Sequence, residues 1–448
     1  MVGPDYKPPQ YPVPQVWNST TAIQPVALTN WWTKFNDAQL DSLIARAITT
    51  NLDLKLAESR VRQARATRGL AASGFWPGVD ASGQYRRQST GGEVPVTGDM
   101  YQAGLDAAWE LDLFGGVRRG IEAADADVRA SVENRRAVLI TVAAEVALNY
   151  LNLRGYQQQL AIAQANIVAQ ERSAELTRQR FPAFASKLDV VNAEAQVATT
   201  RAALPVLESA ARRTMFALGV LLAREPAALT AELETAAPLP VTPPEVPVGL
   251  PAELLRRRPD VRAAEAALHG ATARIGVATA DLFPKFSLTG NLGTSSDTGS
   301  GLVNWNNRFY SFGPTVAWNL FAAGRIRANI EAQNEAERQA WLTYQKTVLA
   351  ALGDVEGALV AYVKEQQHRQ ALLAAVAANQ EAVVLATRLY AEGHTDFLNV
   401  VAAQRALYSV QDALVQSERS VATNLIALYK ALGGGWETEP PIPPRDNR

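Results

Sequence analysis

Few residues in this 448-residue chain are suited to catalysis. The chain has no cysteine, which excludes disulfides, thiolate metal sites and cysteine nucleophiles from the sequence as printed. The three histidines, His269, His368 and His394, lie far apart and offer little for a histidine metal site or a Ser-His-Asp triad. No nucleotide-binding loop or cofactor motif is recognisable. The chain is therefore predicted to be no enzyme and to bind no cofactor or metal.

Charge and hydropathy argue against two further classes of protein. A formal net charge of −1 and a pI near 6.4 disfavour a nucleic-acid-binding protein, which normally carries a basic surplus. The longest apolar run, at 138–153, contains Glu145 and Asn149 and is shorter than a helix that crosses a bilayer. Met1 is followed at once by VGPDYKPP, so no cleavable signal peptide is visible, as expected for a mature exported protein.

The elements of the chain occur twice. Pro77 and Pro284 lie 207 positions apart in matching helix-to-strand junctions, and Trp109 and Trp318 lie 209 apart. A Pro-rich segment separates the halves. Because proline disfavours both helix and sheet, this segment is predicted to be an extended linker. The predicted divisions are an extended N-terminal segment of an equatorial region (1–37), a first repeat (38–236), the linker (237–251), a second repeat (252–432) and a C-terminal tail (433–448).

Each repeat shows the same succession of hydrophobic periodicities. Apolar residues follow helical spacing, then alternate as in two strands, then return to helical spacing in a long and a shorter segment. The β-hairpins are predicted at about 78–112 and 285–321, with strands at about 78–88, 100–112, 285–294 and 309–321. The long helices are predicted at about 117–180 and 325–390, and the shorter ones at about 187–223 and 397–432.

The helix lengths indicate how these elements pack. A helix of about 65 residues extends about 100 Å at 1.5 Å per residue. The helices before and after it, about 35 residues each, together match that length. One long helix would therefore lie against two shorter ones placed end to end. The turns that join long and short helices are RFPAFASKLD at 180–189 and YAEGHTDFLN at 390–399.

The four predicted strands require more than one chain. Closed membrane barrels need about eight strands or more, and open sheet edges invite aggregation. Several chains, each adding four strands, would close such a barrel, and a helical tube continuing from it would form a duct. Aromatic residues recur on one parity of the second strand of each hairpin, as expected for girdles at a membrane interface: Tyr101, Trp109, Tyr310 and Trp318.

A protein of another class also fits part of this pattern. Long Ala-rich amphipathic helices are typical of soluble coiled-coil rods, which serve as adaptors or scaffolds. Such a protein would explain the helices but not four recurring strands with aromatic ends. The alternative stays open at this point, and solubility without detergent would favour it.

Several long motifs carry a resemblance to a known family. They are VGPDYKPP (2–9), WWTKFNDAQLDSLI (31–44), WELDLFGGVRRGIEAADAD (109–127), ELLRRRPDVRAAEAAL (253–268), ATADLFPKFSLTG (278–290) and YKALGGGW (429–436). Together they span the chain from end to end. The chain resembles the outer-membrane efflux channels of the TolC superfamily, specifically the OprM and NodT group of outer-membrane factor lipoproteins.

The resemblance implies a fold and an assembly. It implies a mainly α protein with a β-barrel part: a homotrimer whose 12-stranded outer-membrane barrel, four strands per chain, continues into a long periplasmic α-helical barrel. It also implies a Gram-negative outer membrane as the location. The family's acylated N-terminal cysteine, just before a VGPDY-like stretch, implies a palmitate-bearing lipid anchor in the native protein.

The resemblance also implies a function. Such channels work with an RND-type or similar inner-membrane pump and a periplasmic adaptor, the membrane fusion protein, to expel drugs and other compounds, and they contribute to antibiotic resistance. Conduction would be passive, with an iris-like opening of the periplasmic helices. A type I secretion duct for polypeptides shares this architecture and remains an alternative.

Site residues follow from the same comparison. Gly115 and Gly116 would ease the strand-to-helix turn through their tolerance of positive φ. The family's usual aspartate in a LLDAQR-like run is replaced by Ala402, which leaves Asp189, Asp396 and Arg405 as the candidate periplasmic gate. The tips that would contact the adaptor are Ala185, Ser186, Lys187, Gly393, His394 and Thr395. Helix capping explains several of these tip residues equally well.

Overall fold

The computed structural model describes residues 1–18, 28–91, 96–181, 185–240, 251 and 257–437. The chain forms two compact units, and each takes segments from both halves of the sequence. The sheet unit contains Met1–Tyr11, Ser59–Asn134 and Asp260–Thr347. The hairpin unit contains Pro12–Glu58, Arg135–Pro259 and Val348–Arg448. The described chain is mainly helical, as predicted.

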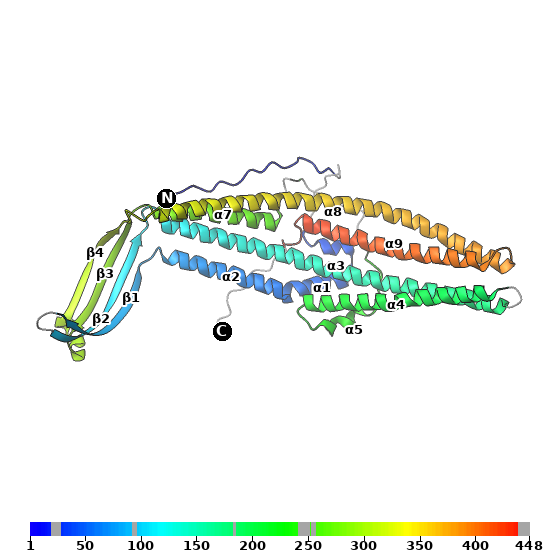
Figure 1. The fold of residues 1–448 in the computed structure, drawn as a ribbon, viewed down its shortest axis with the longest axis horizontal. Helices are drawn as coiled ribbons and strands as arrows, with labels where there is room; N and C mark the ends of the chain where they lie inside the picture. The colour runs from blue at the N-terminus through cyan, green and yellow to red at the C-terminus, as the bar shows by residue number, and fades with distance from the viewer. Residues whose placement is uncertain (19–27, 92–95, 182–184, 241–250, 252–256, 438–448) are drawn as a thin grey trace. The chain divides into compact units, whose positions relative to one another are not determined.

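The sheet unit is built around four antiparallel strands in the order β1-β2-β3-β4 (Figure 1). Strand β2 of the first predicted hairpin pairs directly with β3 of the second. Two short 3-10 helices, η3 (Gly299–Val303) and η4 (Trp305–Asn307), connect β3 to β4. The strands are β1 (Gly78–Thr90), β2 (Val96–Leu111), β3 (Lys285–Ser296) and β4 (Arg308–Ala317).

Four helices meet the sheet, each joined to one strand. Helices α2 (Leu52–Ser73) and α7 (Pro259–Ala280) are both 22 residues long and precede β1 and β3. After β2 and β4 the chain enters two much longer helices, α3 and α8, which begin at Gly116 and Arg325. Ala-rich composition favours these helices, since alanine has the highest helix propensity.

The hairpin unit is named for its two helical hairpins, in each of which a long helix is followed by a shorter antiparallel one (Figure 1). Helix α3 (Gly116–Arg180) has 65 residues and α8 (Arg325–Glu392) has 68. Each is followed by a helix of 35 residues, α4 (Lys187–Leu221) or α9 (Phe397–Ala431). These bounds lie within two residues of the predicted ones. The fourth strand was predicted to reach residue 321, but β4 ends at Ala317.

Two of the motifs form a common core in the hairpin unit. Helix η1 (Trp31–Phe35) comes from WWTKF and leads into α1 (Ala38–Thr50). The Trp31 ring, 1% exposed, stacks on the Tyr429 ring with centroids 5.3 Å apart. Asp37 links this core to α3, because its carboxylate accepts hydrogen bonds from the Leu40 amide and the Tyr150 hydroxyl. The short helices η2 (Pro226–Leu229) and α5 (Thr230–Leu233) follow α4.

Two of the described helices are long and apolar enough to be candidate membrane spans by length and composition. This corrects the reading of residues 138–153 as too short, since α3 carries a sufficient stretch. Just over half of that stretch in α3 is buried inside the protein, so neighbouring helices cover it. None of the corresponding stretch in α8 is buried, which leaves an apolar helix surface without cover in the single chain.

Candidate functional site

The sheet has one apolar and one polar face. Residues directly opposite each other on antiparallel strands share a face, so the register assigns each side chain. One set of paired positions holds mostly apolar residues and is called the apolar face: Val79, Ala81, Tyr85, Tyr101, Ala103, Leu105, Ala107, Trp109, Phe286, Leu288, Leu292, Tyr310, Phe312, Pro314 and Val316. The opposite polar face includes Asp80, Ser82, Gln84, Asp106, Glu110, Lys285, Asn291 and Ser311.

The apolar face is exposed in the single chain. Phe312 is 82% exposed and Tyr310 is 70% exposed, far more than a buried sheet would allow. Within the described residues, the outer edges of β1 and β4 pair with no further strand. A water-exposed sheet with a continuous apolar face and two open edges would aggregate. An apolar environment and further strands at the two edges would remove this exposure.

The predicted aromatic residues lie at two levels of the sheet. Tyr101, Trp109 and Tyr310 lie on the apolar face, whereas Trp318 was expected in a strand and lies just beyond the end of β4. The indoles of Trp109 and Trp318 donate matching hydrogen bonds, each 3.0 Å long, to the backbone carbonyls of Phe75 and Leu282. Both carbonyls follow helices that enter the sheet. The two tryptophans therefore mark the helix-proximal end, and their role in a membrane girdle stays a prediction.

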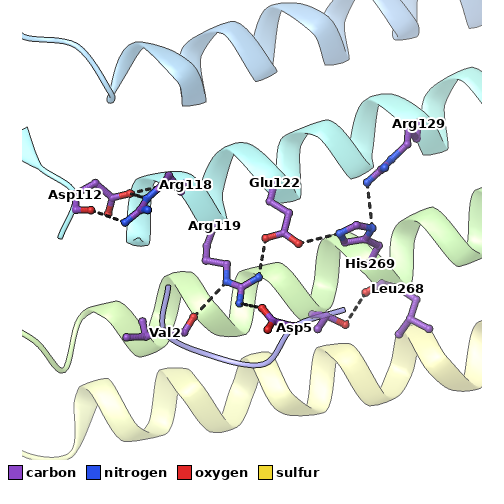
Figure 2. A network of polar contacts seen from close by, with 10 residues as sticks. Val2, Asp5, Asp112, Arg118, Arg119, Glu122, Arg129, Leu268 and His269 are labelled. Atoms are coloured by element: carbon purple, nitrogen blue, oxygen red, sulfur yellow. Dashed lines mark hydrogen bonds and ion pairs between the residues drawn. The ribbon is translucent and has the colours of Figure 1, made fainter. Parts of the chain in front are cut away.

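A turn of tightly bonded polar groups joins β2 to α3. Gly115 has φ +86°, as predicted, but Gly116 does not have a positive φ and is the first residue of α3. The Asp112 carboxylate accepts hydrogen bonds from the backbone amides of Val117 and Arg118 and from the Arg118 guanidinium (Figure 2). Burial alone would raise the pKa of Asp112, but these hydrogen bonds outweigh it and lower the pKa. The carboxylate thus caps the helix as an anion.

The N-terminal segment binds to α3 through a buried arginine. Arg119 is only 2% exposed, and Figure 2 shows its guanidinium between Val2, Asp5 and Glu122. Its Nε donates to the Val2 carbonyl at 3.2 Å, and its Nη1 donates to the Glu122 carboxylate at 2.7 Å. Nη2 donates to the Asp5 carboxylate. A buried guanidinium needs such partners, so the VGPDY segment supplies groups that Arg119 would otherwise lack.

His269 of α7 extends this network. Arg129 Nη2 lies 3.0 Å from His269 Nδ1, and His269 Nε2 lies 2.9 Å from the Glu122 carboxylate (Figure 2). Because arginine can only donate, Nδ1 is the acceptor and Nε2 carries the proton that Glu122 accepts. The Tyr6 ring stacks on His269 with centroids 4.1 Å apart, and the Tyr6 hydroxyl donates to Glu265. We call Arg119, Glu122 and His269 the N-terminal clamp.

The connection between α3 and α4, in the hairpin unit, ends in a complete capping box. The Ser186 hydroxyl accepts a hydrogen bond from the Asp189 amide at 3.1 Å, and the Asp189 carboxylate accepts one from the Ser186 amide at 2.9 Å. The Asp189 carboxylate therefore caps the N-terminus of α4, which begins at Lys187. Ala185 is half-buried beside it. The predicted residues 182–184 of this turn lie outside the described residues.

The second turn ends α8 in a Schellman motif. Gly393 has φ +81°, and the His394 amide donates to the Leu389 carbonyl while the Gly393 amide donates to the Tyr390 carbonyl. The Thr395 hydroxyl accepts a hydrogen bond from Asn399. Asp396 is the N-cap residue of α9 but makes no side-chain capping bond. Its exposed carboxylate therefore differs from that of Asp189.

The ends of the two helical hairpins pack on each other. Tyr390 and Phe397, with rings 5.1 Å apart, belong to a buried cluster with residues of α3, α4 and α9: Ala174, Ala193, Val400 and Val401. Arg180, at the end of α3, donates from Nη1 to the Tyr390 carbonyl at 2.7 Å and from Nη2 to the Ala391 carbonyl. Its guanidinium also lies 5.1 Å from the Tyr390 ring centroid. Arg180 thus caps the last turn of a helix from the other half of the sequence.

Arg405, the third residue of the predicted gate, binds a side-chain amide. Its Nε and Nη2 both donate to the side-chain carbonyl of Gln196, each at 3.3 Å, which links α9 to α4. The structure therefore brings Arg405 to Gln196. The sequence analysis missed Arg180, although a basic residue in the last turn of a helix is a recognised signal.

Comparison with known proteins places these features in a family. A family profile described as outer membrane efflux protein matches residues 43–224 and 250–434. Nodulation protein T of Rhizobium leguminosarum bv. trifolii is 32% identical over 442 residues, covering 97% of this chain and 94% of that protein. The pyoverdine export outer membrane protein OpmQ of Pseudomonas aeruginosa is 33% identical over 425 residues, covering 92% and 88% of the two chains.

A solved structure agrees with this result. The outer-membrane channel OprN superposes with a TM-score of 0.93 and 36% sequence identity, covering 97% of this chain and 99% of that one. The similarity therefore spans both units. The proteins of this family are transport channels rather than enzymes. The chain therefore belongs to the outer membrane efflux protein family, the outer-membrane factors of the TolC superfamily, whose members lie in the outer membrane of Gram-negative bacteria.

Proposed function

We propose that this chain forms the outer-membrane channel of a tripartite efflux system and passively conducts substrates delivered by an inner-membrane pump and a periplasmic adaptor. The observation that carries the proposal is the sheet with an exposed apolar face, a polar face and two open edges. Such a sheet is a segment of a barrel wall, with lipid on one side and water on the other.

Three chains would close this wall. The strand order β1-β2-β3-β4 is antiparallel throughout, so β4 of one chain can pair with β1 of the next in the antiparallel sense. A trimer would then have twelve strands, an even number that leaves no edge. The succession of helix, hairpin, long helix and shorter helix in each half supports two structural repeats per chain.

The helices would continue the duct in the periplasm. The apolar stretch of α8 that is unburied in one chain supports helix packing between neighbouring chains, because an amphipathic or apolar helix surface needs cover. A lipid anchor, as the family's acylated cysteine implies, would be a property of the native protein. It would hold the N-terminal segment near the inner leaflet.

The helical turns would form the periplasmic end of the duct. We place the adaptor contact at Ala185, Ser186, Lys187, Gly393, His394 and Thr395, of which most are exposed. Asp396 is the strongest member of the proposed gate, because its side chain is exposed and makes no capping bond. The side chains of Asp189 and Arg405 are already hydrogen-bonded, to Ser186 and Gln196. Opening would be an iris-like separation of the packed hairpin ends, driven by the adaptor.

The partners would decide what is transported. The relative named for pyoverdine export supports transport outward from the cell. An RND-type or similar pump would supply the energy, since no nucleotide-binding loop or cofactor motif is recognisable in the sequence.

Two measurements test this function. Purified protein should form heat-resistant trimers that give discrete conductance steps in planar bilayers. Deletion of the gene should increase susceptibility in a panel of antibiotics, dyes, solvents and metal salts, and the adaptor should co-purify. A monomer without conductance would contradict the proposal. Loss of a secreted polypeptide with unchanged susceptibility would instead support a type I secretion duct.

A further inference from the structure

The connection between β3 and β4 folds back against the apolar face of the sheet. A Cβ atom placed on Gly299 would lie 3.8 Å from the Tyr101 ring, and the Asn307 amide donates to the Gly301 carbonyl at 2.9 Å. The connection nevertheless exposes two large apolar side chains. Val303 is 90% exposed and Trp305 is 68% exposed. An ordered connection with exposed apolar groups indicates a contact that the single chain does not supply.

Arg308 occupies the rim of this region. It is the first residue of β4 and lies opposite Thr294, which puts it on the apolar face. Its guanidinium carbon lies 5.2 Å from the centre of the Trp305 ring, and Nη1 donates to the Trp305 carbonyl at 3.1 Å. Two contacts therefore hold the side chain in position. Among the residues that the structure describes, Arg308 is in no ion pair, so its charge is uncompensated.

A shallow cavity, open to the surface, lies between this arginine and the strands. Trp305 and Arg308 form its wall. Its floor consists of apolar side chains from β2 and β3, namely Ala103, Leu105 and Leu292, with Thr294 beside them. The floor suits hydrocarbon, and the free donors at the rim suit an anion. The guanidinium matches a phosphate group especially well, because its planar fork can donate two parallel hydrogen bonds.

We propose that this cavity binds a phosphate-bearing lipid, with the phosphate on Arg308 and an acyl chain on Ala103, Leu105 and Leu292. The proposal rests on the proposed function, in which the apolar face contacts the bilayer and the β3–β4 connection lies at the outer leaflet. Charge complementarity identifies the occupant, since an uncompensated cation at the rim of a hydrocarbon-facing surface meets lipid phosphates. The residues that line the cavity all belong to one chain.

Native mass spectrometry of the full-length protein, titrated with bis-phosphorylated lipid A, tests the site. Arg308→Gln removes the charge and should weaken binding about tenfold, since hydrogen bonds to charged groups contribute about 1.5–3 kcal/mol. Arg308→Lys should recover part of the affinity. The matched control is Arg87→Gln: Arg87 lies in β1 toward the same end of the sheet, and its nearest carboxylate, Asp99, is 3.9 Å away. This control should change binding less than twofold.

Two further titrations distinguish the source of the phosphate. Lipid A without phosphates should bind the wild-type protein as weakly as lipid A binds Arg308→Gln. Inorganic phosphate at the same concentration should displace no lipid; displacement would identify a free-anion site and overturn the assignment to lipid. Equal weakening by Arg308→Gln and Arg87→Gln, or no weakening by either, would also overturn it.

Conductance recorded on the same preparations separates this site from the channel function. Arg308→Gln trimers should conduct as the wild-type trimers do while binding less lipid. A conducting protein whose lipid binding does not depend on Arg308 would disprove the lipid site alone. A protein that binds lipid through Arg308 but forms no pore would disprove the channel and leave the lipid site intact.

Discussion

Glu122 is the side chain that joins the two halves of the N-terminal clamp. It accepts hydrogen bonds from Arg119 of its own helix and from His269 of α7. Burial by itself would raise the pKa of Glu122, but these two hydrogen bonds and the Arg119 charge outweigh burial and lower it. A carboxyl with a lowered pKa in the folded protein stabilises the fold at a pH above its ordinary value of 4.5.

Acidification should therefore release the N-terminal segment. The stabilisation by Glu122 is complete above about pH 4.5 and is lost as the pH falls through the lower folded-state pKa. Glu122→Gln should remove about 1–2 kcal/mol at pH 7, which accelerates hydrogen exchange of residues 2–11 about tenfold. The difference from the wild type should vanish at low pH. Glu331→Gln, an exposed glutamate in α8, is the control and should behave as the wild type at every pH.

Asp396 and Asp189 differ in what their carboxylates already do. Asp189 completes the capping box of α4, whereas the Asp396 side chain caps nothing. Three Asp396 carboxylates around a channel axis would repel one another, order water and hold cations at the mouth.

Asp396→Ala should therefore raise single-channel conductance in planar bilayers, by removing bound cations and ordered water from the mouth. Asp189→Ala should act mainly on helix stability, with a cost of about 1 kcal/mol from the broken cap. Glu392→Ala is the control, because Glu392 is exposed near the end of α8 on the other side of the turn. Unchanged conductance of Asp396→Ala, alone and combined with Asp189→Ala, would remove both residues from the gate.

At the scale of helices, Arg180 connects the two hairpins. It ends α3, yet its guanidinium binds the last carbonyls of α8 and lies against the Tyr390 ring. The Tyr390 carbonyl also accepts the Gly393 amide of the Schellman motif, so Arg180 adds a charge-assisted hydrogen bond to it, and a cation at this helix end interacts favourably with the helix dipole. The buried cluster around Tyr390 and Phe397 adds apolar contact between the same helices. The end of α8 therefore depends on α3 for part of its stability.

Arg180→Gln should loosen the end of α8. The loss of charge-assisted hydrogen bonds should cost about 1–2 kcal/mol and accelerate hydrogen exchange at residues 388–394 about tenfold. Arg178→Gln is the matched control: Arg178 lies two residues earlier, is exposed, and pairs with Glu194 and Glu175 on the surface. Surface pairs contribute about 0–1 kcal/mol, so this control should leave exchange at 388–394 unchanged. Equal effects of both substitutions would contradict a specific cap by Arg180.

At the scale of the whole molecule, the two faces of the sheet determine where the chain can reside. Phe312 and Ser311 are neighbours in β4, but the register puts Phe312 on the apolar face and Ser311 on the polar face. In the proposed barrel the first would contact lipid and the second would contact water in the lumen.

Phe312→Arg should therefore impair membrane insertion, at a cost of about 2–4 kcal/mol per chain if the residue lies near the middle of the bilayer. Ser311→Arg introduces the same side chain one position away and should permit insertion while changing ion selectivity. Heat-resistant trimers in isolated membranes measure insertion, and reversal potentials measure selectivity. Equal tolerance of both substitutions would show that the apolar face does not contact lipid.

Local patterns in the sequence predicted the elements and the alternation within the strands. Helical spacing over long stretches and the period of two in residues 100–112 depend only on near neighbours, so they survive in any tertiary context. The capping box at Ser186 and Asp189 was not predicted, although its partners are three residues apart and form a recognised local signal. The end of β4 was placed too late, since Trp318 continues the alternation but its indole bonds to Leu282 after the strand has ended.

Only the tertiary structure decided the contacts between residues far apart in the chain. Glu122 meets His269, Arg180 meets Tyr390, and Arg405 meets Gln196 rather than a carboxylate, because packing brings together helices whose sequences carry no signal of one another. The pairing of β2 with β3, which makes one sheet from two hairpins, belongs to the same class. The sequence by itself determined which segments form helices and strands, since those depend on local periodicity; which side chains meet depends on the fold as a whole.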